Sequence, residues 1–100
     1  MELAPIIRKY AAQVEDFSPD HSWGFPELAD FAAEEVRTTK DRQELKAAIR
    51  ALLDAAPDDI ELNRLWSGTN AGVKFKRDGA RKFLAEWLYA LEHGTHRYAL

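Results

Sequence analysis

The sequence predicts an all-α fold: a compact bundle of four to five helices with short loops, forming a single domain over residues 1–100. Apolar residues recur at steps of three and four along most of the chain, which is the period of helices with one buried face. Proline, glycine and aspartate clusters separate these stretches. A length of 100 residues is typical of one hydrophobic core.

The first helix is expected over residues 3–16. Pro5 fits in its first turn, where an amide has no partner within the helix, and Ser18-Pro19-Asp20 ends the helical pattern. The residues of its apolar stripe are Leu3, Ile6, Ile7, Tyr10, Ala11, Val14 and Phe17.

A second helix is expected to begin at Pro26, with Phe25, Leu28, Phe31, Ala32 and Val36 facing inward. Three carboxylates follow on this helix at positions i, i+3 and i+7, so we expect them to share the opposite, solvent-facing side. They are Glu27, Asp30 and Glu34.

Three further helices complete the predicted bundle. The third has a clean apolar face, with Lys46 and Arg50 outside, and stops at Pro57. The fourth is introduced by Asp58 as N-cap, with Glu61 three residues later. The last ends at Gly94. The expected inward residues are Leu45, Ala48, Ile49, Leu52, Leu53 and Ala56; then Ile60, Leu62, Leu65 and Trp66; then Ala80, Phe83, Leu84, Trp87, Leu88 and Leu91.

Between the fourth and last helices, Val73-Lys74-Phe75-Lys76 alternates apolar and basic residues, as in a short extended segment. The chain offers no convincing second strand to pair with it.

Composition narrows the class of protein. The chain has no cysteine, which excludes disulfides, zinc-thiolate sites and thiol nucleophiles. It shows neither a signal peptide nor a stretch long enough to span a bilayer, so we expect a cytoplasmic protein with no membrane partner. No phosphate loop, nucleophile elbow or paired-carboxylate motif is present, so we expect no enzyme and no cofactor.

Charge is strongly segregated along the chain. Residues 1–36 hold eight acidic and two basic residues, a charge of −6, whereas the whole protein carries −3. An acidic surface on the first two helices accelerates encounter with a basic partner; alternatively it is a solvated face that maintains solubility. The candidate partner-binding residues are Glu15, Asp16, Asp20, Trp23, Glu27, Asp30 and Glu34.

Trp23 belongs to this candidate surface because it lies in a polar loop, where an exposed tryptophan is typical of an interface hot spot. Alternatively it folds back over the first two helices. The acids Asp58, Asp59 and Glu61 need no partner, because a helix N-terminus itself stabilises negative charge.

The basic segment Lys74–Lys82 supports a rival function, a nucleic-acid-binding module. Basic residues interleaved with aromatic ones can follow a phosphate backbone while bases stack on the rings. The sequence pI of about 5.6 and the predicted inward direction of Phe75 and Phe83 count against nucleic acid as the partner. The histidines His21, His93 and His96 have no spacing that favours a metal site.

Three segments together resemble a known family: Val14-Glu15-Asp16-Phe17, then Ala51-Leu52-Leu53, then Arg81-Lys82-Phe83-Leu84-Ala85-Glu86-Trp87-Leu88. In size and order of elements the chain is similar to the small all-α immunity proteins of bacterial contact-dependent growth inhibition systems. The resemblance implies a stoichiometric inhibitor of a cognate toxin C-terminal domain, frequently a nuclease. The segment from Ser18 to Gly24 departs from that family, so no contact residues are transferred. On this hypothesis, the acidic face docks on a basic toxin surface.

Overall fold

The computed structural model of the chain describes residues 2–14, 25–55, 58–69, 75 and 77–93, with the backbone alone for residues 25–28. Within these ranges the chain forms five helices and no strand, which confirms the predicted all-α bundle. None of these helices is long and apolar enough to cross a bilayer. The helices are α1 (Pro5–Ala11), α2 (Phe25–Glu34), α3 (Thr39–Asp54), α4 (Asp59–Ser67) and α5 (Gly79–His93).

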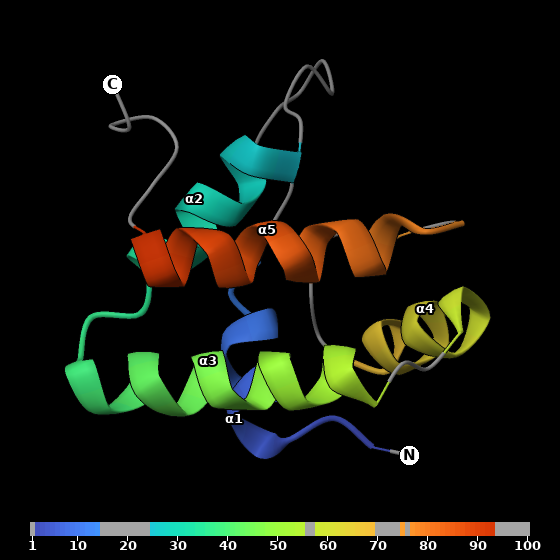
Figure 1. Cartoon of the computed structure of the whole chain (residues 1–100), viewed down its shortest axis with the longest axis horizontal. Coiled ribbons are helices and arrows are strands. Elements are labelled where there is room, and N and C mark those ends of the chain that lie inside the picture. The colour runs from blue at the N-terminus through green and yellow to red at the C-terminus, as the bar shows by residue number, and fades with distance from the viewer. Residues whose placement is uncertain (1, 15–24, 56–57, 70–74, 76, 94–100) are drawn as a thin grey trace.

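Helix α5 organises the bundle, because it packs against α2, α3 and α4, while α1 packs against α3. In Figure 1, α3 and α5 run in opposite directions, α4 lies at one end of the pair, and α2 approaches α5 from a different side than α3 does. The inward row predicted for α5 is correct, except that Leu88 is only partly buried. Its buried residues are Gly79, Ala80, Phe83, Leu84, Trp87, Ala90 and Leu91.

Side-chain caps begin two of the helices. Asp58 accepts a hydrogen bond from the backbone N–H of Glu61 at 2.8 Å, which confirms the predicted N-cap of α4. Thr38 does the same for α3, accepting from the N–H of Asp41 at 3.1 Å. Such caps satisfy amides that have no carbonyl partner within the helix.

Helix α1 is shorter than predicted. It ends at Ala11, and the N–H groups of Gln13 and Val14 bond to carbonyls three residues back, Tyr10 and Ala11, at 3.0 Å each. This tighter turn ends the α-helix but leaves Val14 buried in the core. The apolar spacing therefore identified the buried residues correctly and the helix end incorrectly.

The α4–α5 end of the bundle contains an aromatic cluster formed by Trp66, Phe75, Phe83 and Trp87. The ring centroids of Trp66 lie 5.3 Å from those of both Phe75 and Phe83, and Phe83 lies 5.4 Å from Trp87. These separations favour aromatic pairs beyond the area that they bury. Phe75 faces inward, as predicted, while Val73, Lys74 and Lys76 lie outside the described residues.

Asn63 of α4 joins that helix to the start of α5. Its Nδ2 donates to the carbonyl of Arg77 at 2.6 Å, and its Oδ1 accepts from the N–H of Ala80 at 3.3 Å. Arg77 has a positive φ of 55°, which is uncommon for a residue with a side chain. The bond from Asn63 thus holds a sharp turn of the chain and satisfies an amide in the first turn of α5.

One residue of α4 corrects the sequence analysis. Ile60 was expected inside, but 82% of its surface is exposed. Leu62 and Trp66 are buried one helical turn apart, and a residue two positions before Leu62 points about 200° away from it. The buried face of α4 is therefore narrower than its apolar content indicated.

Candidate protein-binding surface

Most of the predicted partner-binding surface is not described by the structure. Glu15, Asp16, Asp20 and Trp23 lie outside the described residues, as does the side chain of Glu27. Asp30 and Glu34, both on α2, are the predicted residues whose side chains the structure places.

Asp30 is not on a solvent-facing side: its exposed fraction is 0%, and the prediction of an exposed stripe through it is wrong. The alanines Ala29, Ala32 and Ala33 are buried as well, so α2 buries a broad part of its circumference. Small side chains allow helices to approach closely. A buried carboxylate needs a partner, and Asp30 does have an interaction within the chain.

The acidic end of α2, Glu34 and Glu35, is exposed. Helix C-termini carry a partial negative charge and are stabilised by cations, yet α2 has no basic residue in its last turn. Two adjacent carboxylates at this end therefore oppose the helix dipole. Glu34 does have an interaction within the chain, and the guanidinium of Arg42 donates to the carbonyls of Ala33 and Val36 at this same end, at 3.5 and 3.1 Å.

Several acids in α4 and next to α5 form ion pairs within the fold. The carboxylate of Asp59 lies 2.7 Å from Arg81 Nε, and Asp78 lies 3.5 Å from Lys82 Nζ. Glu61 pairs with Arg64, and this contact lowers the pKa of the Glu61 carboxyl. The prediction that Asp58, Asp59 and Glu61 have structural roles agrees with these contacts.

The ion pairs of Arg81 and Lys82 also affect the predicted role of the basic segment Lys74–Lys82 in binding nucleic acid. Two of its cations, Arg81 and Lys82, already face carboxylates, and Phe83 is fully buried, so it offers no ring for a base to stack on. Lys74 and Lys76 lie outside the described residues. Arg77 is exposed. These contacts count against a nucleic-acid-binding groove here.

His93 is the histidine that the structure describes, since His21 and His96 fall outside the described ranges. Its ring lies 4.7 Å from that of Tyr89, one turn earlier on α5. No group of three or more potential metal ligands occurs in the described part of the chain.

Sequence reasoning missed three hollows on the surface. The first, of about 420 Å³, lies along α3 and is lined by residues from Gln43 to Asp54. The second, of about 240 Å³, lies between α3 and the segment leading into α1, and the third, of about 260 Å³, between that segment and α4. The available signal was the run of alanines Ala47, Ala51 and Ala55 on the polar side of α3.

No protein-family model matches this chain, and no curated protein or solved structure does so either.

Proposed function

We propose that this protein is a stoichiometric inhibitor that binds a toxin domain, of the nuclease class, through an acidic surface on its first two helices. The main support for this proposal is the acidic end of α2, Glu34 and Glu35. Glu34 and Glu35 are adjacent and exposed at the end of α2, so a basic partner can reach both carboxylates.

The resemblance to small all-α immunity proteins supports the same function. Nuclease domains bind a polyanion and therefore carry basic clefts, to which a carboxylate surface is complementary. The described surface is narrower than the sequence indicated, because Asp30 is buried and is withdrawn from it. Glu15, Asp16, Asp20, Trp23 and Glu27 remain part of the proposed surface on sequence grounds.

The test is co-expression with the C-terminal domain of a large secreted toxin encoded immediately upstream of this chain's gene. We expect a 1:1 complex and loss of the domain's nuclease activity on adding one equivalent of the chain. If no such domain binds, the proposed function is wrong.

Charge reversal then tests the surface separately. The double variant Glu34→Lys/Glu35→Lys is expected to slow association by roughly tenfold at low salt, with a smaller effect at high salt. Glu44→Lys, which changes an exposed acid of α3, is the matched control and is expected to leave association unchanged. Unchanged kinetics in the double variant would exclude the acidic end of α2 from the interface.

A further inference from the structure

The C-terminal end of α2 is held by a residue of another helix. Arg42, near the start of α3, donates from Nη2 to the carbonyl of Val36 at 3.1 Å and to that of Ala33 at 3.5 Å. Its Nη1 donates to the carbonyl of Leu91 on α5 at 3.3 Å. One guanidinium therefore joins α3 to the ends of both α2 and α5.

These contacts supply a cation where α2 has none of its own. The last carbonyls of a helix have no amide partner within it and carry partial negative charge. The last turn of α2 contains no basic residue, so the positive charge comes from α3. Hydrogen bonds from a charged donor are roughly twice as strong as neutral ones. Arg42 is therefore well suited to fix this end of α2.

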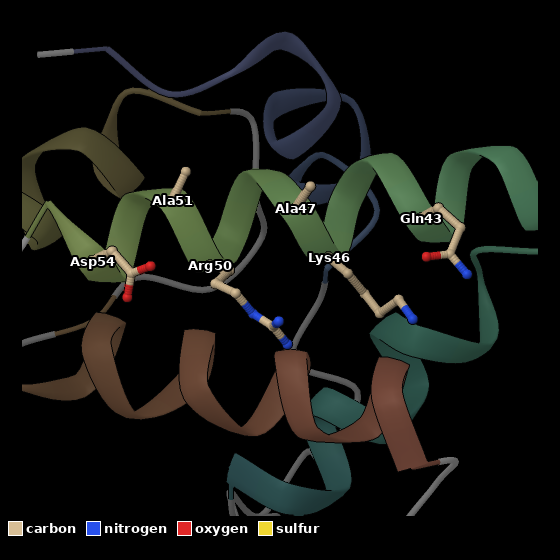
Figure 2. A pocket seen from close by; sticks show the side chains of 6 residues that line it. All are labelled: Gln43, Lys46, Ala47, Arg50, Ala51 and Asp54. Carbon is tan, nitrogen blue, oxygen red and sulfur yellow. The ribbon is translucent and has the colours of Figure 1, made fainter.

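Arg42 begins a row of three cations on α3, followed by Lys46 and Arg50 at successive turns. In Figure 2, the side chains of Lys46 and Arg50 point toward α5. Arg50 pairs with Glu92 of α5, whereas Lys46 forms no ion pair with a described residue. Among the described residues, Arg42 is the member of this row that bonds to the end of α2.

The two exposed carboxylates of the proposed surface, Glu34 and Glu35, lie between the two carbonyls that Arg42 binds at the end of α2. These carbonyls belong to Ala33 and Val36. The N–H of Val36 also donates to the carbonyl of Ala33 at 3.1 Å, and the Val36 side chain is buried. The backbone is thus held on both sides of the acidic pair.

We infer that Arg42 is a positioning residue of the proposed binding surface: it holds Glu34 and Glu35 in place for a basic partner. A fixed pair of carboxylates loses less conformational freedom on binding than a loose pair does. Arg42 carries the same sign of charge as that partner, so its charge by itself opposes association. The inference rests on the proposed function, and it adds the residue that organises the surface.

The first experiment uses the chain alone. Arg42→Met removes all three hydrogen bonds and is expected to accelerate amide hydrogen exchange at Glu35 and Val36, measured by NMR, at least about tenfold. Arg42→Lys keeps the charge but not the planar fork of donors, so it should show the same change in smaller size. Asn63→Ala, which loosens the other end of α5, is the control for general destabilisation and should change these two amides less than about twofold.

The second experiment measures the affinity of the same variants for the toxin domain encoded upstream, at a temperature where circular dichroism shows each variant folded. Arg42→Met is expected to weaken the complex at least about fivefold. Lys46→Met removes a cation from the same row of α3 and is the matched control; it should leave affinity within about twofold or raise it. Asn63→Ala should also leave affinity within about twofold.

Unchanged exchange at Glu35 and Val36 in Arg42→Met would overturn the inference. So would unchanged or tighter binding by that variant, which is the result expected from charge alone. Equal weakening by Asn63→Ala would overturn it as well, because the effect would then be a general loss of stability. If no toxin domain binds the wild type, the proposed function fails instead, and the exchange measurement still decides whether Arg42 fixes the acidic end of α2.

Discussion

The two ends of the bundle are packed in different ways. Where α4 meets α5, large rings fill the interior, with Trp66, Phe75 and Phe83 in mutual contact. Where α1 meets α3, an open hollow remains, and much of its lining is formed by alanines. Polar contacts connect the helices there instead.

Those polar contacts centre on the first turn of α3. Asp41 accepts hydrogen bonds from the Tyr10 hydroxyl and from Lys9 Nζ, the latter at 3.2 Å. Arg42 donates to the carbonyl of Val36 at 3.1 Å and to that of Leu91 at 3.3 Å, which ties α3 to the end of α2 and to α5. Ring packing therefore fills the interior at one end, while specific polar pairs at the other hold the helices together beside an open hollow.

The largest effect is expected from emptying the aromatic cluster. Trp66→Ala should lower the free energy of unfolding by about 3–5 kcal/mol, because a fully buried indole is replaced by a cavity. Ile7→Val, which trims one methyl group on the α1 side, should cost about 1 kcal/mol. Urea denaturation measures both, and a loss well below about 3 kcal/mol for Trp66→Ala would contradict tight packing of the aromatic cluster.

A smaller effect is expected at the turn that joins α4 to α5. Asn63→Ala removes the bonds to the Arg77 carbonyl and the Ala80 N–H, and should cost about 1–2 kcal/mol. Asn63→Asp keeps the acceptor for Ala80 but places a carboxylate oxygen against the Arg77 carbonyl, so it should recover little of that loss. If both variants matched the wild type in urea, the aromatic cluster alone would hold this end together.

On the α1–α3 side, Tyr10→Phe should cost about 1 kcal/mol at neutral pH, because it removes the hydroxyl that donates to Asp41. The hydrogen bond to Asp41, with burial, raises the pKa of Tyr10 to about 12 from 10.0, so the folded state holds this proton more tightly. The stabilisation is therefore complete below pH 10 and is lost between pH 10 and pH 12.

Low pH should weaken the same contact by protonating Asp41, whereas high pH weakens it by deprotonating Tyr10. The hydrogen bonds from Tyr10 and Lys9 lower the pKa of Asp41 below 3.8, so its stabilisation is present above that value and is lost as the pH falls further. Denaturation of wild type and Tyr10→Phe across pH should show a difference that shrinks at both extremes. A constant difference would mean that Tyr10 acts only through packing.

The smallest effect is expected at Ile60. Ile60→Gln should change the free energy of unfolding by less than about 0.5 kcal/mol, because the side chain is 82% exposed. Leu62→Ala, two residues later on the buried face, is the matched control and should cost about 2–5 kcal/mol. Thermal denaturation distinguishes the two variants. A large loss of stability in Ile60→Gln would mean that the Ile60 side chain packs against a neighbouring residue.

The sequence predicted the fold class and most of the core, because helical period and burial are linked directly. The N-cap at Asp58 was predictable because a cap involves residues only three apart in the chain. The candidate site was less predictable. Glu34 was placed correctly on the surface, but Asp30 was assigned to the wrong side, because the width of the buried face of α2 depends on how closely α5 approaches.

The sequence by itself thus determined the features that depend on residues close together in the chain. These are which stretches form helices, which apolar rows they bury, and where charge accumulates. Only the tertiary structure decided the burial of Asp30, the exposure of Ile60, the hydrogen bond from the Ala80 N–H to Asn63 and the hollow between α3 and the segment leading into α1. Each of these depends on contacts between helices whose distances and orientations the period of one helix does not specify.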